Sequence, residues 1–356
     1  MVEAIQPSVQ SARAEFFARG QIPHDRVGQP ILRAWLRCAD MGLDHARPPE
    51  VEPPEAANIR ELCERHERLR RLCRPELDAL NAEARETGGI AILTNAEGVV
   101  LDAFGDSSFA GRAAEVALRP GIAWNETAMG ANAIGAALAE RRAVAVHGGE
   151  HYYDAHGILS CAAAPILDPR GAVVGVLDLS AHADMQRLHA LGLVRLAVEQ
   201  IEHRFFAGGI EGASVLRFHT EAALVGAARE GVLVFDEDHR LIGANRRGLS
   251  MLRQDWSALD VTTFADLFET APDLGGDLKE WRAHDGGRFH GVMRPPASAP
   301  SAPAAAPAAR TLEDAELAMM RAALEACGGN VSAAARQLGV HRSTLYRRVF
   351  GPDQAN

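Results

Sequence analysis

Regularly spaced hydrophobic residues predict helices in the first 87 residues of the chain. Between residues 31 and 39, apolar side chains recur every three to four positions, as they do on the buried face of an amphipathic helix. Leucines follow a similar spacing in the charged segment 59–86, where Pro75 is expected to interrupt the helix. We therefore interpret residues 1–87 as a helical N-terminal region.

The pattern changes at Gly88, where short apolar runs bounded by turn residues replace the helical spacing. Such runs are typical of β-strands, and a helix of small residues is expected over 128–140. The expected strands are 90–94, 99–103, 144–146, 160–167 and 172–179. The last two flank an Asp-Pro-Arg-Gly sequence, which is a strong turn signal. Residues 88–206 are therefore predicted to form an α+β domain.

The helix predicted over residues 184–206 has two interpretations. Its apolar residues alternate at three- and four-residue intervals, which is the spacing of a coiled coil. These residues are Leu191, Val194, Val198, Ile201 and Phe205. Because two heptads are short, a helix packed against the sheet of its own domain fits the pattern equally well.

A second strand–turn–strand pattern begins at residue 231 and indicates a smaller domain over residues 207–294. Strands are expected at 231–235, 241–243 and 289–294, with a helix near 245–252. The segment that follows, 295–309, contains only proline, alanine and serine. Such a run cannot build a core, so it predicts a semi-extended linker.

Residues 310–356 have the length of a three-helix unit and contain glycines where helices are expected to end. The helices are expected over 312–327, 331–338 and 341–350. Four arginines and no acids occur between residues 336 and 350, whereas the first helix carries four acids and one arginine. A basic helix beside an acidic one is what contact with DNA phosphates predicts. A three-helix interaction module with a solvated basic face is the alternative.

The composition excludes several classes of function. The chain has a formal charge of −10, so any contact with nucleic acid must come from a local basic patch. Lys279 is the only lysine, and the residues around it do not form a P-loop, so the sequence predicts no Walker-type ATPase. No common catalytic motif occurs either, and we predict that the chain is not an enzyme. Five scattered cysteines, no signal peptide and no apolar membrane span predict a reduced cytoplasmic protein with no membrane partner.

Several motifs resemble those of one family of bacterial regulators. The sequence GGN-x-SAAARQLGV-x-R-x-TLYRR, residues 328–348, resembles the Fis-type helix-turn-helix of enhancer-binding proteins. ILRAWLRCADMGLD, residues 31–44, resembles the N-terminal signature of acetoin-catabolism regulators, and residues 120–138, 148–155 and 160–180 resemble their GAF sensor domain. Residues 215–294 are similar to a PAS domain. The resemblance implies a multidomain α+β protein: a helical N-terminal region (1–87), a GAF-like α/β sandwich (88–206), a PAS-like α+β domain (207–294), a Pro/Ala linker (295–309) and a Fis-type helix-turn-helix (310–356).

The sequence departs from this family at one point. Family members usually carry an AAA+ ATPase between the sensor and the DNA-binding domain, and here the linker stands in that place. We therefore expect a regulator that neither hydrolyses ATP nor remodels sigma-54 polymerase. It would act by occupying DNA, by touching RNA polymerase, or by modulating an ATPase-bearing relative.

The recognition helix supplies the DNA-binding candidates. They are His341, Arg342, Ser343, Thr344, Tyr346, Arg347 and Arg348. Arginine can bind guanine with two hydrogen bonds, and serine or threonine can bind phosphate or base edges. Leu345 and Val349 are expected in the core of the unit. A homodimer on double-stranded DNA is the expected assembly.

The effector-binding candidates are polar or aromatic groups that interrupt apolar sequence in the GAF-like domain. They are Trp124, Asn125, Thr127, Asn132, His151, Tyr152 and Cys161. Residues 125–127 also fit a helix N-cap. His147, His151, His156 and Asp154 fit no standard metal site, so no metal or cofactor is predicted.

The leading prediction is a transcription regulator that responds to a small ketone, alcohol or related metabolite. One alternative is an adaptor that hetero-oligomerises with an ATPase-bearing relative. Another is a GAF-type redox enzyme that uses Cys161, although a cysteine within an apolar strand is more often an inert hydrophobic residue. The sequence leaves open the effector, the target promoter and the sign of regulation.

Overall fold

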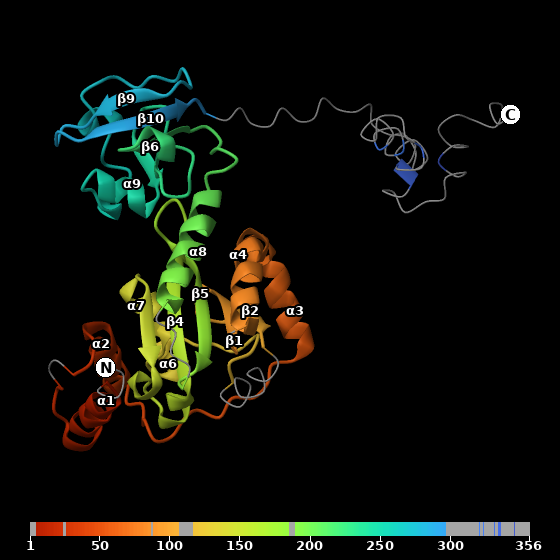
Figure 1. The fold of residues 1–356 in the computed structure, drawn as a ribbon, viewed down its shortest axis with the longest axis vertical. Helices are drawn as coiled ribbons and strands as arrows, with labels where there is room; N and C mark the ends of the chain where they lie inside the picture. The colour runs from red at the N-terminus through yellow and green to blue at the C-terminus, as the bar shows by residue number, and fades with distance from the viewer. Residues whose placement is uncertain are drawn as a thin grey trace. The chain divides into compact units, whose positions relative to one another are not determined.

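The computed structural model describes residues 5–23, 26–86, 88–106, 117–184 and 189–296, with side chains from residue 9, and six positions in the C-terminal unit. The chain divides into two compact units, Met1–Ala297 and Ser298–Asn356. The first unit contains two five-stranded sheets (Figure 1). In the described part of the chain, no helix has the length and apolar character needed to cross a membrane.

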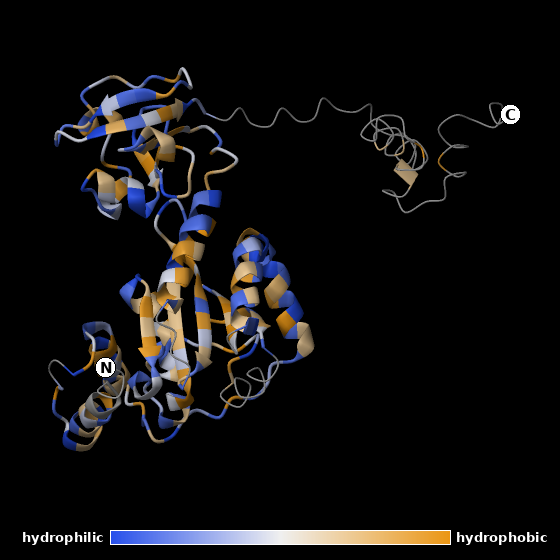
Figure 2. Ribbon diagram, in the orientation of Figure 1, coloured by the Kyte–Doolittle hydropathy of each residue, from blue (hydrophilic) through white to orange (hydrophobic). Residues whose placement is uncertain are grey.

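The first sheet is antiparallel, with the strand order β2-β1-β5-β4-β3. Its strands are β1 (Gly89–Asn95), β2 (Val100–Gly105), β3 (Val144–His147), β4 (Leu159–Leu167) and β5 (Val173–His182). They lie within two residues of the predicted positions at nearly every end, because each strand is an apolar run bounded by turn residues. Figure 2 shows these strands mainly in hydrophobic colours.

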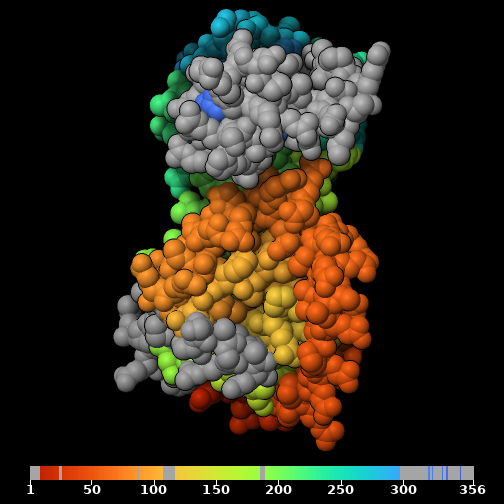
Figure 3. Space-filling model, turned by 90° about the vertical axis from the view of Figure 1, so that its right-hand side faces the viewer, coloured from red at the N-terminus to blue at the C-terminus, as the bar shows by residue number. Residues whose placement is uncertain are grey.

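Two long helices cover one face of this sheet. They are α4 (Glu67–Glu86) and α8 (Ala190–Arg204), and α8 crosses strands β4 and β5 in Figure 1. Val194, Val198 and Ile201 of α8 are buried in one core cluster with Leu77 of α4 and Leu177 of β5. The residues with coiled-coil spacing therefore pack on the sheet of their own chain. Figure 3 shows the outer surface that α4 forms with α3 (Ala56–Arg65), in orange.

The expectation that Pro75 interrupts the helix is wrong, because α4 continues through this residue. The chain breaks instead at His66, between α3 and α4. Arg204 of α8 donates a hydrogen bond of 2.8 Å to the carbonyl of Leu72, in the turn before Pro75, and forms an ion pair with Glu76. Burial of the helix against the sheet and this added donor offset the roughly 3 kcal/mol that proline costs inside a helix.

The opposite face of the first sheet is covered by short helices. They are α6 (Glu126–Met129), α7 (Ala133–Glu140) and α2 (Gln29–Asp40), preceded by α1 (Ile5–Arg13) and a π-helical turn (Ala14–Ala18). The single helix predicted over 128–140 is divided because Gly130 has a φ of +62°. A Cβ atom there would lie 2.7 Å from the Cβ of Tyr152. Glycine is thus required by a contact with a residue far along the chain.

The second sheet has the order β8-β7-β6-β10-β9. Its strands are β6 (Ser214–His219), β7 (Gly231–Phe235), β8 (Leu241–Ala244), β9 (Lys279–Arg282) and β10 (Arg288–Arg294). The helices of this part are α9 (Arg246–Met251) and α10 (Phe264–Leu267). Short 3₁₀ turns occur at Ala222–Leu224 and Trp256–Ala258 in this part, and at Gly148–Glu150 and Asp154–Ile158 between β3 and β4 of the first sheet. Strands β6 and β9 were not predicted, whereas β7, β8, α9 and β10 confirm the expected pattern.

In the second unit the structure describes Met320, Ala323, Val331, Ala334, Ala335 and Leu345, and each is helical. Ala323, Ala334, Ala335 and Leu345 are buried together, and Val331 packs against them. The core position predicted for Leu345 is confirmed. Val349 and the remainder of the three predicted helices lie outside the described residues.

Candidate functional site

Two asparagines hold the ends of α6 and α7 in place. Asn125 accepts a hydrogen bond from the backbone N–H of Ala128 (2.9 Å) and donates one to the carbonyl of Glu97 (2.9 Å). Asn132 accepts from the N–H of Gly135 (2.9 Å) and donates to the carbonyl of Gly130 (2.8 Å). The predicted helix cap at residue 125 is therefore confirmed. Both amide groups bond to backbone, and Thr127 is exposed.

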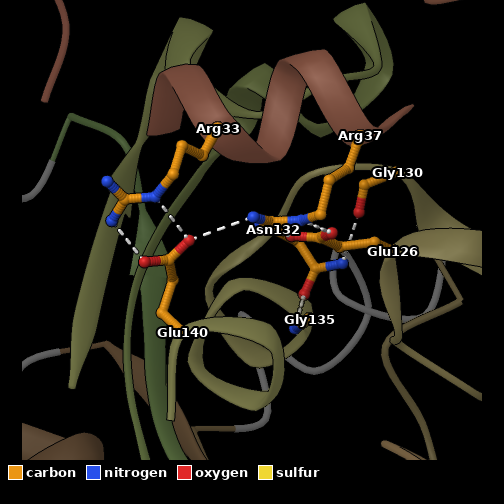
Figure 4. Close-up of polar contacts among 7 residues, drawn as sticks. All are labelled: Arg33, Arg37, Glu126, Gly130, Asn132, Gly135 and Glu140. Carbon is orange, nitrogen blue, oxygen red and sulfur yellow. Dashed lines mark hydrogen bonds and ion pairs between the residues drawn. The ribbon is translucent and has the colours of Figure 1, made fainter. Parts of the chain in front are cut away.

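Two arginines of α2 fasten α6 and α7 to the N-terminal region (Figure 4). Arg37 donates two hydrogen bonds to Glu126, of 2.6 and 2.7 Å, and a third to Glu140 at 3.0 Å. Arg33 donates from Nε to Glu140, also at 3.0 Å. The hydrogen bond from Arg33 lowers the pKa of Glu140 to about 2. Because Glu126 and Glu140 are almost fully buried, these ion pairs fix how the two helices lie over the sheet.

His151 offers an unused acceptor in the same region. Its Nδ1 lies 3.0 Å from the carbonyl of Gly148, and because a carbonyl can only accept, Nδ1 must carry the proton. Burial lowers the pKa of His151 to about 3, so the ring is neutral at pH 7. Its Nε2 is then an unprotonated acceptor, buried and without a partner among the described residues. A buried acceptor of this kind is usually hydrogen-bonded, so this nitrogen is a candidate for binding a hydrogen-bond donor.

His156 and two large aromatic residues form a wall beside this acceptor. The ring of His156 lies 5.0 Å from Trp124 and 5.5 Å from Tyr153, measured between centroids, and 6.4 Å from His151. Burial lowers the pKa of His156 to about 4. Its Nδ1 is also buried and lacks a partner within the described ranges. Two neutral histidines with free ring nitrogens therefore lie among apolar side chains.

The loop that carries His151 is held by the N-terminal helices. Arg13 donates to the carbonyls of Gly149 (2.9 Å), His151 (2.6 Å) and Tyr152 (3.1 Å). Trp35 donates from its indole N–H to the carbonyl of Glu150 at 2.7 Å. The hydroxyl of Tyr152 donates to the carbonyl of Leu43 at 2.8 Å. The position of His151 thus depends on residues more than 100 positions earlier in the sequence.

Cys161 lies on β4 opposite Ser180 of β5. The hydroxyl of Ser180 is 3.0 Å from the sulfur of Cys161 and 2.5 Å from Oδ2 of Asp178. All three residues are buried. Burial raises the pKa of Cys161 well above its ordinary value, so the side chain is a thiol at neutral pH. Because the thiolate is the nucleophilic form, this environment disfavours redox or nucleophilic chemistry at Cys161.

With this geometry established, comparisons with known proteins place the chain in a family. The family model described as the MimR N-terminal domain matches residues 6–203, which is more than half of the chain. The chain belongs to this family. The model of the bacterial regulatory protein Fis family matches residues 311–349.

Two relatives of this chain have names that describe transcriptional regulators. The acetoin catabolism regulatory protein of Cupriavidus necator is 33% identical over 200 residues, covering 56% of this chain and 29% of that protein. The propane 2-monooxygenase operon transcriptional activator MimR of Mycolicibacterium smegmatis is 30% identical over 197 residues, covering 55% and 33%. The matched region is thus about a third of these relatives' length. A chain in the solved complex of E. coli DhaR(N) with DhaL is 13% identical, with a TM-score of 0.48, covering 75% of this chain and 100% of that one.

Within the MimR-type domain, the structure brings together some of the predicted effector residues. Trp124, Tyr152 and Cys161 share one buried cluster on the face of the sheet under α6 and α7. His151 and Asn132 are also buried. Asn125 and Thr127 lie toward the surface. No group of three or more His, Cys, Asp or Glu side chains in the described ranges is arranged to hold a metal ion.

Several residues of this site were not predicted as effector ligands. They are Arg13, Tyr153, His156, Asp178 and Ser180. His156 and the Asp178–Ser180 pair had a signal in the sequence, because they are polar residues within or beside apolar runs. Arg13 had none, since only the fold brings it to the loop. The seven DNA-binding candidates, residues 341–344 and 346–348, lie outside the described residues.

Proposed function

We propose that this chain is a DNA-binding transcription regulator whose activity is controlled by a small molecule bound in its MimR-type domain. The observation that carries the proposal is the presence of both matches in one chain, a MimR N-terminal domain at residues 6–203 and a Fis-type helix-turn-helix at 311–349. The relatives named above are regulators of catabolic operons. Chains built in this way connect a sensor to a DNA-binding unit.

The first sheet with α6, α7 and α8 is the GAF-like sensor of this proposal, over residues 88–206, and α2 and α4 of the N-terminal region pack against it. The second sheet is the PAS-like domain, over residues 207–294, and the segment 295–309 is the linker. The helix-turn-helix of a homodimer then reads two half-sites about one turn of DNA apart, ~34 Å. In this proposal the recognition helix presents His341 and Arg342 to the groove, with Thr344 and Arg347 at backbone or bases.

The free acceptor of His151 indicates the chemistry of the effector. A buried Nε2 lone pair is satisfied by a donor, and among the small ketones, alcohols and related metabolites considered above, a hydroxyl group supplies one. Trp124 and Tyr153 offer apolar surface for a short carbon chain. A neutral molecule is favoured because neither His151 nor His156 is charged at pH 7. The effector is therefore a small neutral compound that carries at least one hydroxyl group.

Regulation in this proposal does not use ATP. The one lysine of the chain, Lys279, lies on strand β9 and forms an ion pair with Asp273. The chain would act by occupying DNA or by contacting RNA polymerase. A second candidate is an adaptor that joins an ATPase-bearing relative, which the similarity of about 200 residues to longer regulators favours.

The experiment is a binding assay with the full chain. Genomic fragments selected by the protein supply the operator, and fluorescence anisotropy measures affinity at physiological salt with and without candidate hydroxylated metabolites. Arg342→Ala should abolish specific binding, whereas the control Arg321→Ala, in the acidic segment predicted as the first helix, should retain it. Unchanged affinity in Arg342→Ala would refute the recognition assignment, and a regulator that binds no fragment would refute the function. Size-exclusion chromatography with and without an ATPase-bearing relative separates the adaptor from the independent regulator.

A further inference from the structure

A cavity of about 540 Å³ lies where the part of the chain built on the first sheet meets the part built on the second. On the first side its walls come from α8, β4 and residues 142–143. On the second side they come from α9 and its cap, Asn245. The volume is within the range of sites for small organic molecules, roughly 300–1,000 Å³. This cavity is separate from the buried cluster around His151.

The lining is rich in arginine. Its charged residues are Arg142, Arg195, Glu199, Glu202, Arg246 and Arg247. The lining therefore contains four arginines and two glutamates. The excess of two positive charges is unusual in a chain whose formal charge is −10.

One of the four arginines is already bound. Arg246 donates to Glu202 at 3.1 Å and to the carbonyl of Pro165 at 2.6 Å. Glu202 is buried, and its Oε1 also accepts the backbone N–H of Leu167 at 2.8 Å. Arg246 and Glu202 thus neutralise each other and join α9 to α8 and β4. The Nε of Arg246 is still buried without a partner in the described part of the chain.

The other three arginines keep most of their hydrogen-bonding capacity. Arg247 lies 3.8 Å from Glu199, and Arg142 lies 4.0 Å from Glu140, which are both too long for hydrogen bonds. Glu140 is in addition occupied by Arg33 and Arg37. Among the described residues, Arg195 has no ion-pair partner. Each guanidinium offers five N–H donors in a planar fork that fits carboxylate and phosphate oxygens.

We propose that this cavity is a binding site for a small organic dianion, either a phosphate monoester or a dicarboxylate. Arg142, Arg195 and Arg247 bind the anionic groups, and the carbon skeleton lies against Val198 and Met251. The excess of two positive charges matches the charge of the ligand. The walls of the cavity come from the parts of the chain that contain the first and the second sheet. The bound dianion therefore bridges α8 and α9 and acts as a second effector. This site is independent of the effector proposed near His151.

The test is isothermal titration calorimetry on the full chain at constant ionic strength. The probes are glucose 6-phosphate and succinate, and glucose is the neutral control. The double variant Arg195→Gln/Arg247→Gln removes two positive charges from the cavity. The matched control is Arg68→Gln/Arg71→Gln, which removes the same charge from exposed positions of α4 that do not line the cavity. Arg247 has only the long ion pair with Glu199, at 3.8 Å, and Arg195, Arg68 and Arg71 have no ion-pair partner in the described ranges, so both variants should fold.

We expect one dianion per chain, no binding of glucose, and at least about tenfold weaker binding in the cavity variant, since charged hydrogen bonds are lost. The control should bind within about twofold of the unaltered chain. Preference for one probe identifies the anionic group, phosphate or carboxylate. If neither dianion binds at millimolar concentration, or if the α4 variant weakens binding as much as the cavity variant, the proposal is wrong. If the circular dichroism spectrum shows that the double variant does not fold, Arg142→Gln is measured in its place. It should also weaken dianion binding at least about tenfold.

Discussion

Replacing Arg37 with glutamine should loosen the helices that cover the candidate effector site. Arg37 is the one described residue whose side chain bonds to the carboxylate of Glu126, through two hydrogen bonds of 2.6 and 2.7 Å. The variant leaves this carboxylate, which is 9% exposed, without a cation. Breaking a fully buried pair costs about 3–5 kcal/mol. Because the side chain of Arg37 is itself 35% exposed, water can replace part of the interaction, and we expect a loss of roughly 2–3 kcal/mol.

Arg33→Gln is the matched control. Arg33 is 46% exposed, and its partner Glu140 keeps the hydrogen bond from Arg37, so we expect a clearly smaller loss of stability than in Arg37→Gln. Urea unfolding followed by tryptophan fluorescence measures both variants, since Trp35 and Trp124 lie in the affected core. Hydrogen exchange then locates the change in α6 and α7. Equal losses in the two variants, or a double variant Arg37→Gln/Glu126→Gln no more stable than Arg37→Gln, would refute the reasoning.

Two further predictions concern the same site. The folded-state pKa values of His151 and His156, about 3 and about 4, lie below the ordinary value of 6.5, so the unfolded chain binds protons first as the pH falls. Stability should therefore decline from pH 6.5 toward 4, by up to about 1.4 kcal/mol per pH unit for each histidine, and His156→Phe should reduce the slope of unfolding free energy against pH. Gly130→Ala should destabilise the chain by about 2–4 kcal/mol in urea unfolding, because of its positive φ and the contact with Tyr152, whereas Gly192→Ala, in α8 with no atom near its Cβ position, should be neutral or slightly stabilising. A flat pH profile, or equal effects of the two alanines, would contradict these predictions.

Three strands of the first sheet could be predicted because they are buried on both faces. A strand covered on both sides is a continuous apolar run, and β1, β4 and β5 have this pattern. Strand β9 shows the opposite case, since Trp281 is its only buried residue and the sequence there is mainly charged. Its position follows from pairing with β10, which the local sequence does not encode.

The candidate site shows the same division between local and distant causes. Trp124, His151 and Cys161 were singled out because each interrupts an apolar or small-residue segment, and all three are buried, with Trp124 and Cys161 in one core cluster. The break between α6 and α7 depends on a contact between Gly130 and Tyr152, and the His151 loop depends on Arg13. Neither follows from local spacing. Sequence reasoning thus named several buried side chains of the candidate site but not the residues that position them.

The contacts of Glu202 indicate how the two sheets of the first unit can be coupled. Strand β4 contains Cys161, in the core of the MimR-type domain, and ends at Leu167, whose N–H donates to Glu202. Glu202 in turn accepts from Arg246 of α9. A shift of β4 on effector binding would therefore strain or relax a buried ion pair that belongs to both parts of the chain. Because the cavity beside that pair is lined by three weakly paired arginines, an anion bound there would act on the same contact. The two proposed ligands would then influence each other's affinity to an equal extent, as thermodynamic linkage requires, without touching each other.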